Sequence, residues 1–326
     1  MSELRGYGNM ELKNEKFMDK GVVLNKNLRV NDTIYVGEHT FGCGHKVPVF
    51  EVNTIHGLNQ LIGHVKFNNR QYGNVYYRGE CHLHDNLNPS FIRGKKNYSK
   101  AEQKLIAYMD DVLTDDELFK NLKLSKTGDW NRNKHKLEGV LQHYGVPTRY
   151  IDVVDNHWIA LWMGLYKCKK YSILQTYYHY EKRVIPFEEF ATKGPLKDKE
   201  FYQYILLIGT PYGESLKKDG VYESENYIEV DLRDALPSIF LRPHAQHGIV
   251  LRKKIHEDRS YDYNMATDVL GILRARIDRV SDWLGNGTLL SQNNLFPSPA
   301  FDTGYGLLLS KSELLDREEF SIAKYV

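Results

Sequence analysis

The chain has 326 residues, of which 41% are hydrophobic and 26% charged, a composition typical of a globular protein and not of a disordered or fibrous one. Its 44 Lys and Arg residues nearly balance its 42 Asp and Glu residues, which argues against non-specific nucleic-acid binding through excess positive charge. Three scattered cysteines show no close C-x-x-C spacing, so we expect reduced thiols. No apolar signal segment opens the sequence, and no apolar run reaches about 18 residues, so we expect a cytoplasmic protein without a membrane anchor.

The first half of the chain alternates short strands with helices. Runs of β-forming residues predict strands at 33–36, 47–52 and 75–77. Residues 54–67 repeat apolar side chains at helical spacing, which predicts a helix with one buried face. Two capping-box patterns, at 99–102 and 114–117, each predict the start of a further helix.

The second half begins with two more helices. The segment 130–144 is predicted to be helical and to end at Gly145, and Pro147 prevents its continuation. Residues 155–166 are apolar on nearly all sides, which predicts a buried helix. Strands are predicted at 172–178, 204–208, 227–230 and 248–251. A last long helix is predicted over 265–284, where apolar residues follow one stripe.

This order of elements predicts an α+β fold in which helices are followed by a mainly antiparallel sheet. We expect one main domain over residues 52–300. A β-rich N-terminal extension is expected over 1–51, and a C-terminal tail over 301–326 that packs on the domain.

Two segments carry polar residues where a purely structural account would favour apolar ones. Arg78 ends an aromatic strand next to Gly79, so a fixed guanidinium lies beside backbone that a ligand can approach closely. A structural salt bridge of Arg78 is the alternative. The turn after the helix at 130–144 presents His143, Thr148 and Arg149 together. A histidine at a helix C-terminus is also favoured by the helix dipole alone.

Two later segments also stand out in the sequence. Arg242 and Gln246 precede a strand, and Gly248 beside them allows close approach of a ligand. The Phe296-Pro297 pair is interpreted as a packing contact.

These segments resemble the FRG domain family, which is named for an F/Y-R-G motif. The matching motifs are Tyr77-Arg78-Gly79, Leu87-x-Pro89-Ser90-x-x-Arg93, Leu141-Gln142-His143-Tyr144-Gly145-Val146-Pro147-Thr148-Arg149-x-x-Asp152, Arg242-x-x-Ala245-Gln246-x-Gly248 and Leu295-Phe296-Pro297. The resemblance covers roughly residues 52–300. The chain departs from the family pattern at Tyr150 and Val153-Val154, which we expect to be core positions.

The resemblance implies no established general activity, but FRG domains are common in bacteria and mobile elements, often near toxin or defence genes. The Tyr77-Arg78-Gly79 strand is also similar to the first-strand arginine of arginine-class ADP-ribosyltransferases. This similarity implies an ADP-ribosyltransferase-like core with NAD as its substrate. We therefore expect an ADP-ribosyltransferase-like or NAD-hydrolysing effector, such as a toxin or an anti-phage defence protein. The Ser-Thr-Ser segment of those enzymes is absent from the sequence.

This hypothesis assigns roles to the site residues. Planar guanidinium groups would bind the pyrophosphate. Carboxylate, amide or aromatic groups would bind the ribose and stabilise the oxocarbenium-like state. The expected catalytic residues are Arg78, His143 and Gln246. The expected substrate-binding residues are Gly79, Glu80, Arg93, Tyr144, Thr148, Arg149, Asp152 and Arg242, and Glu229 is a further carboxylate for the ribose. Asp152 is also expected to accept hydrogen bonds from the turn or from Arg149. We expect no metal, and we predict that Arg78, His143, Arg149 and Gln246 line one cavity.

Two other classes of function stay open. In the first, the chain is a non-enzymatic module that senses a nucleotide or nucleic acid and triggers a partner protein, with arginines on phosphate and tyrosines on bases. In the second, it is a metal-dependent nuclease, for which His82-x-His84-Asp85 is the sole cluster in the sequence. For the enzyme, the sequence leaves open which protein or nucleic acid would accept ADP-ribose.

Overall fold

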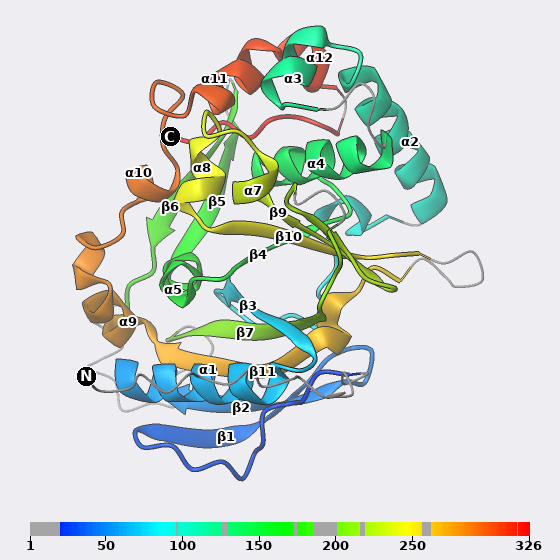
Figure 1. The fold of residues 1–326 in the computed structure, drawn as a ribbon. Helices are drawn as coiled ribbons and strands as arrows, with labels where there is room; N and C mark the ends of the chain where they lie inside the picture. The colour runs from blue at the N-terminus through cyan, green and yellow to red at the C-terminus, as the bar shows by residue number, and fades with distance from the viewer. Residues whose placement is uncertain are drawn as a thin grey trace, which may run out of the picture.

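The computed structural model describes residues 20–95, 97–124, 130–172, 175–185, 201–215, 219–255, 262–317 and 319–326. Nine strands form one sheet, whose spatial order is β1 (Thr33–Thr40), β2 (Lys46–Val52), β11 (Val269–Arg276), β7 (Tyr202–Pro211), β3 (Gly73–Glu80), β4 (Ile151–Val154), β10 (Gly248–Lys253), β9 (Tyr227–Asp231) and β8 (Val221–Glu223). A separate hairpin consists of β5 (Tyr166–Ser172) and β6 (Thr176–Lys182). Figure 1 shows the sheet running through the middle of the molecule.

The helices pack mainly on one face of this sheet, the face on which Tyr77, Val154 and Val250 lie. They are α1 (Ile55–Asn69), α2 (Tyr98–Val112), α3 (Asp116–Asn121), α4 (Trp130–His143), α5 (His157–Leu165), α7 (Leu232–Ala235), α8 (Leu241–Ala245), α9 (Ile277–Trp283), α10 (Gln292–Leu295), α11 (Thr303–Ser310) and α12 (Ser312–Leu315). None of these described helices is long and apolar enough to span a bilayer. The predicted α+β class with a mainly antiparallel sheet is confirmed, because β2 and β11 form the one parallel pair described.

The sheet is nearly divided between β3 and β4. Eight residue pairs join β3 to β7, whereas the described residues of β3 and β4 form a single pair, Tyr77 with Val154. We call this junction the seam. It separates a half-sheet that ends at β3 from a half-sheet that begins at β4, and backbone groups on either side of it need partners other than a neighbouring strand.

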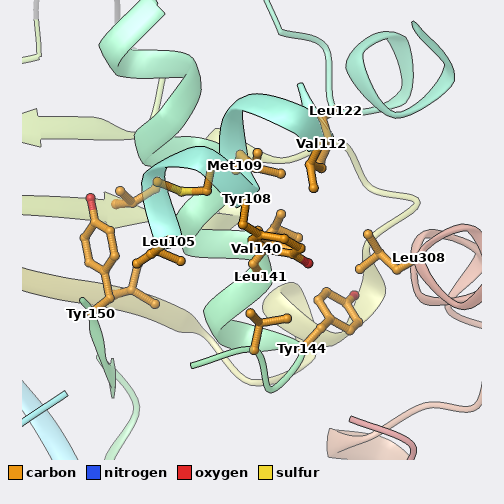
Figure 2. Close-up of a cluster of buried hydrophobic side chains, with 14 of the residues drawn as sticks. Leu105, Tyr108, Met109, Val112, Leu122, Val140, Leu141, Tyr144, Tyr150 and Leu308 are labelled. Carbon is orange, nitrogen blue, oxygen red and sulfur yellow. The ribbon is translucent and has the colours of Figure 1, made fainter. Parts of the chain in front are cut away.

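Hydrophobic side chains form one cluster over each half-sheet, and a third cluster crosses the seam on the other face of the sheet, from Tyr76 of β3 to Ile151 of β4 and Ile249 of β10. One cluster joins α1 and α5 to β3, β7 and β11 and includes the fully buried Trp162. Another joins α2, α3 and α4 to β9 and β10, and Figure 2 shows its centre around Leu105, Met109 and Val140. Burial of each such aliphatic side chain contributes about 1.5–3 kcal/mol. The seam lies between the two clusters, at β4.

Local sequence explains several helix ends, though not always through the residues predicted. Helix α1 begins after Thr54, whose hydroxyl accepts the Gly57 N–H. The capping boxes at 99–102 and 114–117 predict two other helix starts close to the observed positions, but the residue that each box identifies as the N-cap is wrong. The side chains of Asn97, two residues before the predicted cap, and of Asp115, one residue after the predicted cap, cap α2 and α3 by accepting their first free N–H groups.

Two predicted elements are wrong. Residues 269–276, expected within a long helix, form β11, and only 277–283 are α-helical, after a 3-10 turn at Met265–Asp268. The strand is buried on both faces, and such a continuous apolar run has no period that separates it from a buried helix. The strand expected at 172–178 instead spans the turn of the β5–β6 hairpin, of which 173–174 lie outside the described residues.

The N-terminal strands β1 and β2 belong to the same sheet as the rest, since β2 pairs with β11. At the other end, the residues after α12 return to the hairpin, where Tyr325 forms a bridge with Tyr178. The expected domain boundaries at 51 and 300 stay a prediction.

Candidate functional site

Arg78 lies on β3 one residue beyond the seam. Its Nη1 donates to the carbonyl oxygen of Asp152 at 2.6 Å, and its Nε donates to Glu80 Oε1 at 2.6 Å. The guanidinium thus takes the place of a backbone partner that β3 would supply to β4 in an unbroken sheet. Burial disfavours its charge, but Glu80 and Asp152 outweigh burial and raise the pKa of Arg78.

Gly79 allows α5 to pack directly on this end of β3. A Cβ atom at position 79 would lie 1.9 Å from the carbonyl oxygen of Ala160 and 2.8 Å from the nitrogen of Gly164. No side chain fits in that space, so the glycine of the F/Y-R-G motif is required for helix packing. Gly79 thus packs against α5, and its expected contact with a ligand stays a prediction.

The Asp152 carboxylate contacts two polar side chains that come from α4. Gln142 Nε2 donates to Asp152 Oδ2 at 2.6 Å, and Nδ1 of His143 lies 3.4 Å from Oδ1. The Thr148 hydroxyl donates to Gln142 Oε1 at 2.7 Å, which fixes the amide orientation. The Q-H-x-x-x-x-T spacing therefore orients one carboxylate at the seam. The expectation that Asp152 pairs with Arg149 is wrong.

The Asp152 carboxylate is ionised and accessible. Burial opposes its charge, but the hydrogen bond and charge of His143, together with Gln142 and Arg78, lower its pKa. Its side chain is nevertheless 41% exposed, although β4 is an interior strand and the Oδ1 atom is buried. A negative charge in this position can approach a bound molecule.

His143 lies flat against Gly248 of β10. A Cβ atom there would lie 2.7 Å from His143 Cε1 and 3.3 Å from each ring nitrogen, so only glycine admits the ring. The His143 side chain is 4% exposed. Its Nε2 has no hydrogen-bond partner within the described part of the chain. Asp152 and Gly248 therefore hold an imidazole whose second nitrogen is uncommitted.

Arg93 adds a second guanidinium to this group. It follows the 3-10 turn at Ser90–Ile92, and its Nε donates to the Asn88 carbonyl at 3.0 Å. Partial desolvation and the neighbouring charge of Arg78 lower the pKa of Arg93. Its side chain stays exposed. We refer to Arg78, Glu80, Arg93, His143 and Asp152 as the seam cluster.

Arg149 belongs to a different, buried network. Its Nε and Nη2 donate to Glu138, which is completely buried, and its Nη1 donates to Glu102 at 2.7 Å. These carboxylates outweigh the effect of burial and raise the pKa of Arg149. A charge pair so enclosed ties α4 to α2 and to the turn, which is a structural role.

Arg242 and Tyr144 lie in an aromatic enclosure beyond α4. The Arg242 guanidinium is completely buried, with Cζ 4.5 Å from the ring centroids of Tyr144 and Tyr325 and 4.6 Å from that of Tyr305. Its three guanidinium nitrogens have no hydrogen-bond partner among the described residues. Asp302 accepts from the backbone N–H of Arg242 and from the Tyr144 hydroxyl. The aromatic rings stabilise the guanidinium through cation–π contacts.

Gln246 closes the same region by donating to the Leu295 carbonyl at 2.6 Å. Phe296 packs at 4.5 Å on Tyr180 and at 5.0 Å on Tyr325, as the interpretation of a packing contact predicts. The structure thus brings Arg78, Glu80, Arg93, His143 and Asp152 together. It places Arg149, and separately Arg242, Tyr144 and Gln246, in networks with their own partners, and their roles toward a ligand stay predictions.

Sequence reasoning missed the residues that hold the site in position. Gln142 was visible only as part of a motif, and the partner of Arg149 is Glu138, 11 residues earlier. Glu138 follows no short pattern that could have identified it. The pairing of Gly248 with His143 could have been suggested by the glycine beside Gln246, whose close approach is to a side chain instead of a ligand.

Three cavities, of about 330, 1140 and 230 Å³, are found at other places on the molecule. The described residues contain no group of three or more His, Cys, Asp or Glu side chains that could hold a metal ion. The rings of His82 and His84 lie against each other, with centroids 4.2 Å apart and planes tilted by 57°.

Comparison with protein families identifies this region. Residues 73–172, from β3 to the end of β5, match the FRG domain family. The chain therefore contains an FRG domain, and the matched span holds every residue of the seam cluster. No curated protein and no solved structure matches the chain.

Proposed function

We propose that the FRG domain of this chain binds NAD⁺ at the seam cluster and breaks its nicotinamide–ribose bond, as an ADP-ribosyltransferase-like or NAD-hydrolysing effector. The observation that carries the proposal is the meeting of two guanidinium groups, Arg78 and Arg93, with the accessible carboxylate of Asp152. Permanently charged planar donors suit a pyrophosphate. A carboxylate beside them suits the cation that develops on the ribose.

The reaction balances with groups present in the cluster. The bond between ribose C1′ and the pyridinium nitrogen breaks, and its electron pair leaves with nicotinamide, which becomes neutral. Asp152 stabilises the positive charge on the ribose, and a water oxygen then bonds to C1′. His143, whose Nε2 is uncommitted, accepts the proton of that water. In a transferase, a nucleophile of a protein or nucleic acid replaces the water.

The test is release of nicotinamide from NAD⁺ by the purified full chain, followed by chromatography. Asp152→Asn keeps the size and removes the charge, so release should fall at least about a hundredfold. Arg93→Gln should raise KM by about tenfold or more. Arg29→Gln, at an exposed position away from the cluster, is the matched control. Absence of nicotinamide release at micromolar enzyme would overturn the catalytic proposal.

A non-enzymatic nucleotide sensor is the second candidate. It is favoured by the burial of His143 Nε2, which water does not reach in this conformation. A sensor would bind NAD⁺ or another nucleotide with an affinity that depends on Arg93 and would release no nicotinamide. Binding measured by calorimetry beside the release assay therefore separates the two functions.

The biological setting is proposed with the enzyme. Depletion of NAD⁺ or modification of a target would stop growth, which is what a bacterial toxin or an anti-phage defence protein achieves. Expression of the wild-type chain in bacteria should then arrest growth, and Asp152→Asn should relieve the arrest. A regulatory partner protein would be required in cells that carry the active form.

A further inference from the structure

A second opening lies on the other side of the seam. β4 ends at Val154, and the chain then turns toward α5, so the first half of β3 pairs with β7 on one side and has no described strand on its other side. A cavity of about 330 Å³ occupies this space between β3, β10 and α1. We call it the α1–β3 cavity. It is separated from the seam cluster by the Tyr77–Val154 pair.

Positive charge predominates on its walls. Lys66, Arg70 and Arg233 line the cavity, against a single acid, Asp155. Arg233 is already engaged, since it donates to Asp155 at 2.8 Å and to Asp231 at 2.6 Å.

Lys66 and Arg70 are engaged only by rings and a carbonyl. Lys66 Nζ lies 5.1 Å above the ring of Tyr77. Arg70 lies over Phe67 and donates to the Phe67 carbonyl at 2.9 Å. In the part of the chain that the structure describes, neither forms an ion pair with a carboxylate. Both cations can therefore turn toward an anion in the cavity.

Uncharged polar groups line the inner wall. Tyr76, which lines the cavity, donates its hydroxyl to Glu229 at 2.6 Å. Glu229 is 8% exposed, and burial raises the pKa of its carboxyl. Asn74, on the same wall, also hydrogen-bonds Glu229. Amide, phenol and carboxyl groups of this kind bind the hydroxyls of a sugar.

We infer that the α1–β3 cavity binds a small phosphate monoester, a sugar phosphate or a mononucleotide, with its phosphate on Lys66 and Arg70 and its hydroxyls toward Asn74 and Tyr76. The volume lies at the lower end of the range for ligand pockets, about 300–1,000 Å³, which suits a small monoester. The site is separate from the seam cluster, and the inference does not depend on the proposed NAD⁺ chemistry.

The experiment is calorimetric titration of the full chain with ribose 5-phosphate, AMP, inorganic phosphate and ribose. The double variant Lys66→Gln/Arg70→Gln should weaken the two monoesters by about ten- to a hundredfold. Arg29→Gln, which also removes one exposed positive charge, should leave them unchanged. Ribose without phosphate should bind far more weakly than ribose 5-phosphate.

A second variant tests the inner wall. Asn74→Leu should weaken ribose 5-phosphate and leave inorganic phosphate unaffected, because only the sugar reaches that wall. Equal affinity of the double variant and the wild type, or no saturable binding of either monoester at millimolar concentration, would overturn the inference. Release of nicotinamide by the double variant should match the wild type, so the two proposals fail or hold separately.

Discussion

At the scale of single residues, Arg78 joins the two half-sheets as well as contributing charge to the seam cluster. Its planar group reaches Glu80 and the Asp152 carbonyl at once. Lysine carries the same charge but cannot make both contacts. We expect Arg78→Lys and Arg78→Ala both to lower the free energy of unfolding, by roughly 1.5–3 kcal/mol for a lost charge-assisted hydrogen bond, with alanine the worse. Urea denaturation measures the effect. An alanine variant as stable as the wild type would show that Arg78 serves a ligand alone.

Glu229 gives a residue-scale prediction that depends on pH. Burial raises the pKa of its carboxyl above the ordinary value. Between the unfolded and folded pKa values the unfolded chain is the more ionised, so stability falls as pH rises through that window. Glu229→Gln cannot ionise and should lose this fall, becoming more stable relative to the wild type at pH 7 than at pH 4. Thermal midpoints at both pH values provide the test, and an unchanged difference would contradict it.

At the scale of elements, the contact between α4 and β10 depends on Gly248. A methyl group there would lie 2.7 Å from His143 Cε1, so Gly248→Ala should displace the ring and cost about 1–3 kcal/mol of stability. Nicotinamide release should be lost as well. Gly63→Ala is the control, because its Cβ meets no atom within 4 Å in the exposed middle of α1, and alanine there should stabilise by about 0.5–1 kcal/mol. An active, stable Gly248→Ala protein would separate His143 from the chemistry.

Elements with a local signal could be predicted from the sequence, and those fixed by distant contacts could not. The apolar spacing of α1 and the glycine after α4 specify those helices within a few residues. β11 has no such signal, because it is apolar on both faces and its conformation is fixed by pairing with β2 and β7. The site follows the same rule. Motif spacing predicted Arg78 and His143 as neighbours, but the separation of Arg149 depends on Glu138, which no motif contains, and on Glu102, which the sequence shows only as part of a capping box.

At the scale of the whole molecule, Arg242 connects α8 to the last residues described and to the β5–β6 hairpin. Its charge is buried among rings without hydrogen bonds for its guanidinium nitrogens in the described chain. Arg242→Met keeps the length and removes the charge, so stability should be unchanged or higher. Arg242→Ala leaves a cavity and should lose about 2–5 kcal/mol. Unfolding in urea compares the variants. Equal losses for Met and Ala would show that the charge itself is needed.

The seam has a mechanical consequence for the whole sheet. Two half-sheets that are joined by one residue pair can twist relative to each other about that pair, as about a hinge, while each half-sheet keeps its own hydrogen bonds. Arg78 braces the hinge on one side of Tyr77, and the hydroxyl of Tyr76 braces it on the other by reaching Glu229. A molecule bound on either side would change the angle of the same hinge. A ligand at one opening would then change the affinity of a ligand at the other, and the second would change the affinity of the first by the same factor. The Tyr77-Arg78-Gly79 motif would then lie at the axis of the motion that couples the two openings.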